Sequence, residues 1–187
     1  MSMNSENPQT TTSERRPVIY RPEDYVGLFR HSLIFIIDGL VVGFGVVLIL
    51  GFFELLGGSN SEILGPIATI LSVASAWWYL AVLKPSRFRT LGYWIADAKI
   101  ETLYGLPPTP WRMTLRLMLI VGWLFGIPTD IVTDFIWTTM GDDRQMLRDL
   151  ICETRLVRNK AKPIRFGRIT YCLFTGLGRI LYYARVQ

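Results

Sequence analysis

A single carboxylate, Asp38, interrupts an apolar run that otherwise carries no charge between residues 31 and 53, with His31 taken as neutral. At the centre of a bilayer an aspartate costs at least about 2.5 to 3.5 kcal/mol on insertion scales. We therefore expect Asp38 to face other protein segments and to be protonated, paired with a base or bound to a cation. Such a carboxylate either lies on an ion or ligand path or forms an ion pair that only fixes helix packing.

The base that would pair with Asp38 must come from another segment. Arg30 and His31 precede Asp38 by eight and seven residues, whereas side chains that meet on one helix are three or four residues apart. Arg112 and Arg116 open a later apolar block, and we expect the partner of Asp38 among them.

Asp130 and Asp134 form a second candidate site, because residues four apart share a helix face. Two neighbouring carboxylates can coordinate a cation or relay a proton, with the pKa of one raised by the other. The alternative is that both are solvated at the membrane interface.

Other kinds of chemistry find little support. The chain has one histidine, and its two cysteines, Cys152 and Cys172, are 20 residues apart, which suits neither a zinc site nor a disulfide framework. GxSxG, HExxH, P-loop and GxGxxG motifs are missing. We therefore expect no enzyme, no metal and no cofactor. The net charge of +5 comes without a nucleic-acid-binding pattern, so we interpret it as the cytoplasmic face of a membrane protein.

Long apolar blocks must position these charges. Residues 31–53 would span about 34 Å as a helix, enough for a hydrocarbon core of about 30 Å, and residues 63–83 carry no charge. The third block, 112–140, is either one kinked span or a hairpin that turns near residues 126–128. We favour the hairpin because ten lysines and arginines follow residue 140, and such residues stay in the cytoplasm.

Lysine and arginine also predict the orientation. Four precede the first span, none lies in the turn at 54–62, and six lie between 84 and 116. The positive-inside rule therefore predicts a multi-pass protein of the cell (inner) membrane with a cytoplasmic N-terminus. Because two or three helices enclose little space, a pore would require a homo-oligomer.

The two ends of the chain are polar or basic. Residues 1–20 predict a disordered cytoplasmic tail, and residues 163–187 predict a basic amphipathic helix at the membrane interface. Three arginines of that helix would contact anionic headgroups of the lipid bilayer: Arg165, Arg168 and Arg179. Residues 98–105 and 153–159 alternate in character, as short strands that could pair on one side of the membrane.

These elements predict an all-α membrane protein: a small helical transmembrane bundle over residues 21–160, a short cytoplasmic β element and the C-terminal amphipathic helix. Within it, "RHSLIFIID" (30–38) and "DRQMLRDLICETRLV" (143–157) resemble the RDD family of bacterial membrane proteins, named for one arginine and two aspartates. The intervening "TLGYWIADAKIETLYGLPPTPWRMTLR" resembles the glycine-led segment of that family. By this resemblance the three residues are Arg30, Asp38 and Asp149.

The chain departs from the family pattern at three positions. The family arginine usually stands seven residues before the aspartate, where this chain has His31. The basic residue expected after the glycine is Tyr93, and the histidine expected before the last aspartate is Arg148. The resemblance implies an integral membrane protein that moves ions or small ligands, with cation/proton exchange proposed for some members. The alternative is a membrane scaffold that binds partners without transport.

Overall fold

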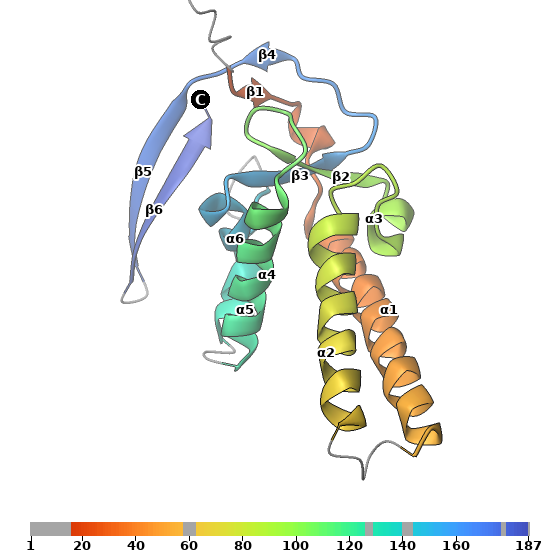
Figure 1. Cartoon of the computed structure of the whole chain (residues 1–187). Coiled ribbons are helices and arrows are strands. Elements are labelled where there is room, and N and C mark those ends of the chain that lie inside the picture. Colours follow the sequence, from red (N-terminus) through yellow and green to blue (C-terminus); the bar gives the residue numbers. More distant parts are fainter. Residues whose placement is uncertain (1–15, 58–62, 126–128, 140–143, 177–178, 187) are drawn as a thin grey trace, which may run out of the picture.

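Two long apolar helices dominate the computed structural model, which describes residues 16–57, 63–125, 129–139, 144–176 and 179–186. The first is α1 (Leu28–Leu55), and the second is α2 (Leu64–Trp77), which continues into a π-helical segment, η2 (Trp78–Leu83). They pack side by side and project from the rest of the molecule (Figure 1). The boundaries agree closely with the spans predicted at 31–53 and 63–83.

Both helices are long and apolar enough to cross a membrane. Only 11% of the apolar window of α1 and 17% of that of α2–η2 is buried within the chain. A core helix of a soluble protein would instead be buried on most sides. The apolar surface that these helices leave exposed suits a lipid environment.

A small mixed layer covers one end of these helices. It contains α3 (Leu91–Ile95) and two strands, β2 (Ala98–Thr102) and β3 (Thr154–Arg158). The strands form an antiparallel ladder from Ala98 opposite Arg158 to Thr102 opposite Thr154. The ladder lies within the segments 98–105 and 153–159 that the sequence indicated as short strands. The main apolar core lies where this layer meets the first turns of α1.

The third apolar block forms two helices, α4 (Pro110–Phe125) and α5 (Thr129–Trp137), which contact each other. In one straight helix, Arg116 and Asp134 would be separated by about 27 Å. Instead they bind two consecutive residues, Asp149 and Arg148, of the short helix α6 (Leu147–Ile151). The helices α4 and α5 thus lie side by side, as in the hairpin alternative, while the predicted turn at residues 126–128 lies outside the described part of the chain.

The N-terminal segment is ordered earlier than expected. Val18–Ile19 form strand β1, which pairs with β4 (Arg165–Phe166), and the single turn η1 (Pro22–Asp24) follows. Val18 and Tyr20 are buried in a second small core with Tyr25, Val157 and Ala161. The apolar run "PVIY" thus ends the predicted tail before residue 18, because these side chains bury against the strand layer. Residues 1–15 lie outside the described part of the chain.

The predicted C-terminal amphipathic helix is wrong. Strands β5 (Ile169–Gly176) and β6 (Arg179–Val186) form an antiparallel hairpin instead, which lies to one side of the helices (Figure 1). Both strands are rich in β-branched and aromatic residues, which favour extended structure. The segment whose arginine spacing indicated a helix contains these two strands, whose backbone groups pair with each other.

Candidate functional site

Asp38 is buried, with 2% of its surface exposed, and its ionic partner is Lys84. The Lys84 Nζ lies 2.9 Å from Asp38 Oδ2. Three further groups donate hydrogen bonds to the carboxylate: the Thr90 hydroxyl at 3.0 Å, the Gly92 backbone N–H at 3.0 Å and the Tyr79 hydroxyl at 3.3 Å. Asp38 is thus paired, as expected, but with neither Arg112 nor Arg116.

The π-helical geometry of η2 explains how one segment supplies two of these partners. In an α-helix, residues five apart point about 140° away from each other. A π-helix closes its hydrogen bonds over five residues, so such residues come onto nearly the same face. Tyr79 and Lys84 can therefore both reach Asp38.

The remaining donors come from the start of α3. Thr90 is the N-cap residue of this helix, and the Gly92 N–H belongs to its first turn, where backbone N–H groups have no partner within the helix. Asp38 supplies the acceptor from α1. One carboxylate thereby joins α1, η2 and α3.

A second buried carboxylate, Asp149, holds α4 and α6 together. Arg116 Nη2 lies 2.7 Å from Asp149 Oδ1, and His31 Nε2 lies 3.9 Å from Asp149 Oδ2. Asp149 is the third residue of α6 and also accepts a bond from the N–H of Met146, as in a capping box. His31 and Asp38 lie on one face of α1. This helix therefore carries one of the two carboxylates, Asp38, and faces the other, Asp149, through His31.

A third pair joins α5 to α6. Arg148 donates to Asp134 from its backbone N–H at 3.0 Å and approaches it with Nη1 at 3.1 Å. The Arg148 guanidinium also lies over the ring of Phe135. Asp134 is fully buried, and Arg148 is nearly so.

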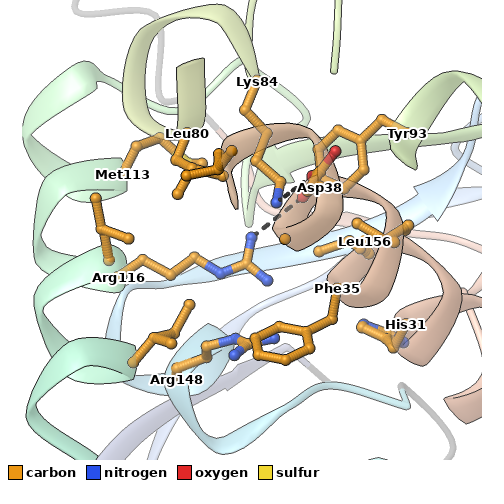
Figure 2. A pocket seen from close by; sticks show the side chains of 15 residues that line it. His31, Phe35, Asp38, Leu80, Lys84, Tyr93, Met113, Arg116, Arg148 and Leu156 are labelled. Atoms are coloured by element: carbon orange, nitrogen blue, oxygen red, sulfur yellow. Dashed lines mark hydrogen bonds and ion pairs between the residues drawn. The ribbon is translucent and has the colours of Figure 1, made fainter. Parts of the chain in front are cut away.

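Tyr93 connects these ion pairs. Its hydroxyl accepts a hydrogen bond of 3.3 Å from Arg116, and its ring lies beneath the Lys84 ammonium at 4.7 Å. Figure 2 shows Lys84, from above, and Arg116, from the left, extending toward the region of Asp38 and Tyr93. Three basic and three acidic side chains thus form one buried network across five helices.

The network surrounds a cavity of about 140 Å³ between α1, η2 and α4. Asp38, Lys84, Arg116, Arg148 and His31 line its polar part. Apolar side chains of α1, η2 and α4 form the remaining wall, and Figure 2 shows several of them.

The charges of the network keep Asp149 ionised. Burial by itself raises the pKa of Asp149, but Arg116, the neighbouring His31 and the charge of Arg148 together hold that pKa below its ordinary value of 3.8. Burial lowers the pKa of Arg148 from its ordinary value, against the opposing effect of Asp134.

A comparison with protein families covers the segment that contains this network. The model of the RDD family matches residues 25–153. The chain belongs to the RDD family. This range contains all six ion-pair residues, and together with the two apolar helices it indicates a membrane protein. Among curated proteins and among solved structures, none matches the chain.

The RDD arginine inferred from the resemblance, Arg30, does not take part in the network. It donates a hydrogen bond of 3.0 Å to the carbonyl of Ala96, at the end of α3. His31, which stands at the usual family position of the arginine, is the residue that faces Asp149. The predicted Asp38 and Asp149 both belong to the site of this RDD protein.

The secondary candidates fall into different places. Arg112 pairs with Glu153 at 3.0 Å, with both side chains one-third exposed. Arg116 and Asp134 lie in the buried network. Asp130 belongs to α5, but its side chain lies outside the described part of the structure. Within the described ranges, no group of three or more His, Cys, Asp or Glu side chains could hold a metal ion.

Sequence reasoning missed Lys84 as a partner, because a lysine after an apolar span is typical of a membrane boundary. The approach of Lys84 to Asp38 depends on the π-helical segment η2, which apolar periodicity does not reveal. Arg148 was noted only as a departure from the RDD pattern. Its position beside Asp149 places it in a buried short helix, where a charged residue requires a partner.

Proposed function

We propose that this RDD protein is a multi-pass protein of the cell membrane that transports an ion or a small ligand through the site around Asp38. The observation that supports the proposal is the buried Asp38–Lys84 pair on the wall of a cavity between apolar helices. Ionisable residues within membrane segments are expensive and commonly mark ion and proton paths.

The pair offers a simple means of exchange. A proton or small cation that reaches Asp38 competes with Lys84 for the same carboxylate, and an anion competes with Asp38 for Lys84. Separating a buried pair without a replacement charge costs about 3 to 5 kcal/mol. Occupation of the site and rearrangement of the pair are therefore coupled.

The proposed orientation follows from charge. The helices α4 and α5 lie side by side, so strand β1 and the basic segment after residue 144 lie on the side of the strand layer. We place that side in the cytoplasm because it carries the lysines and arginines.

The test is ion flux into proteoliposomes that contain the purified protein, with an imposed pH gradient and Na⁺ or K⁺ as the counter-ion. We expect flux with the wild type and its loss in Asp38→Asn. Glu54→Gln changes an exposed acid on the same helix and should retain the flux. Equal flux in the wild type and Asp38→Asn, or none in either, would contradict transport through this site.

A non-transporting scaffold is the second candidate function, and one observation favours it. Asp38 already has four partners within the chain, so its charge is satisfied without any solute. In that case the network fixes helix packing, and the exposed arginines Arg165 and Arg168 serve contacts with anionic headgroups. The Arg179 side chain lies outside the described part. Neither function requires enzymatic chemistry.

A further inference from the structure

Two arginines that line the cavity each have a buried nitrogen without a hydrogen-bond partner within the described chain. The two atoms are Arg116 Nε and Arg148 Nε. Each side chain is more than nine-tenths buried. A buried donor without an acceptor destabilises a protein by about 1 to 3 kcal/mol, and more when the group is charged. The two guanidinium groups beside the cavity are therefore incompletely satisfied within the described chain.

Arg148 provides a second sign of a missing acceptor. Its Nη2 donates to the sulfur of Met146 at 2.7 Å, and a thioether is only a weak acceptor. One guanidinium thus has a single strong partner, Asp134, although it carries five N–H groups. A carboxylate is the acceptor that a guanidinium binds best, often through two parallel hydrogen bonds.

The charges on the cavity wall also favour an anion. Lys84, Arg116 and Arg148 line the cavity together with one acid, Asp38. The acids that balance the two arginines, Asp134 and Asp149, lie behind them and are fully buried. An anion in the cavity would therefore meet basic groups first.

The size and the apolar wall of the cavity indicate the rest of the ligand. The cavity of about 140 Å³ is close to one of about 150 Å³ that accommodates benzene. Ile34, Phe35, Val42, Leu80, Leu117 and Ile120 form its apolar lining. An inorganic anion would leave this surface without a partner, whereas a short hydrocarbon chain would bury against it.

We propose that the cavity binds a small organic monocarboxylate, with the carboxylate at Arg116 and Arg148 and the hydrocarbon part between α1 and α4. This inference rests on the proposed function, because it names the ligand class of the same site.

The test is calorimetric titration of the full chain in detergent with butyrate, which has about as many non-hydrogen atoms as benzene. Butyramide has nearly the same shape without the charge and serves as the control ligand. We expect butyrate to bind and to raise the unfolding temperature, and butyramide to bind at least tenfold more weakly. Absence of butyrate binding, or equal binding of both ligands, would overturn the proposal.

Cavity-filling variants locate the binding. Ile120→Phe places a larger side chain in the cavity and should weaken butyrate binding at least tenfold, whereas Val121→Phe changes the exposed neighbour on α4 and should not. Val42→Phe and Val47→Phe form a second such pair on α1, with Val47 exposed, in case the first variant does not fold. Equal affinity in all folded variants would place the ligand elsewhere and contradict the proposal.

Binding in detergent separates this proposal from transport. If butyrate binds as described but the proteoliposomes show no flux, only the transport function fails. If flux depends on Asp38 but butyrate does not bind, the ligand class fails and the transport function remains.

Discussion

Gly92 lies so close to Asp38 that a methyl group on its Cα would come within 2.7 Å of the carboxylate Oδ1 and within 2.8 Å of the Ile34 carbonyl oxygen. The backbone of α3 therefore packs directly on α1 at the position of the acid. Only a residue without a Cβ permits this distance, and it is the distance that lets the Gly92 N–H donate to Asp38.

Gly92→Ala should destabilise the protein by about 1 to 3 kcal/mol, the usual result of overpacking a closely packed position. Thermal unfolding in detergent measures the change. Gly122→Ala is the control, because a methyl group there meets nothing within 4 Å, and alanine is the better helix former. If both variants unfold at the temperature of the wild type, the contact between α1 and α3 is looser than described.

Lys84→Met should destabilise the protein by about 3 to 5 kcal/mol, because it leaves the buried Asp38 without its counter-charge. In Asp38→Asn with Lys84→Met, the amide still accepts bonds from Thr90 and Gly92, and most of the loss should be recovered. A double-mutant cycle of unfolding free energies measures the coupling. Additive effects of the two substitutions would show that the pair does not interact.

Acid should destabilise the protein through Asp149. The pKa of this group in the folded protein lies below its ordinary value of 3.8, so its contribution to stability is complete above that pH and is lost as the pH falls below it. Asp149→Asn should lower stability near neutral pH and reduce the further loss on acidification. Unfolding temperatures between about pH 2 and pH 6 test this, because the loss begins below the ordinary pKa of 3.8.

Glu153→Gln is the control for the acid experiment. Its pair with Arg112 is one-third exposed, and such pairs contribute at most about 1 kcal/mol. This variant should follow the wild type over the whole pH range. An acid response of Asp149→Asn that also matches the wild type would contradict the role given to Asp149.

The two cysteines should differ in reactivity. Cys152 is buried, and burial raises its pKa to about 11, so little thiolate is present at neutral pH. Cys172 on β5 is partly exposed. Brief maleimide treatment of the native protein should label Cys172 and leave Cys152 unmodified, as mapped by mass spectrometry. Denatured protein, in which both are labelled, is the control, and equal native labelling would contradict the described burial.

A reporter fused after Arg185 should report the cytoplasm. The hairpin of α4 and α5 brings the chain back, and the basic residues that follow favour that side. A fusion at residue 57, at the end of α1, should report the opposite side. Both fusions reporting the same side would overturn the proposed orientation.

The sequence predicted the burial of Asp38 because an acid among apolar residues must face protein. It did not predict Lys84, whose approach depends on a π-helical segment that apolar periodicity does not reveal. The resemblance to the RDD family indicated Asp149 as a site residue. Its partner Arg116 was expected to pair with Asp38 instead. Ion-pair partners on separate helices depend on tertiary packing, which local patterns do not contain.

The C-terminal hairpin was misread for a related reason. Arginine spacing over 163–187 matched a helix, but the frequent β-branched and aromatic residues of β5 and β6 favour strands. A short segment can satisfy both patterns, and here strand pairing between its two halves decided between them.

Every described partner of the Asp38 carboxylate is encoded later in the chain, and the nearest, Tyr79, follows it by 41 residues. Until the segments that carry these partners pack against α1, this helix carries an acid without its partners. Neutralisation waits for η2 and α3 to arrive. The first helix of this domain therefore depends for its charge balance on segments that follow it in the chain.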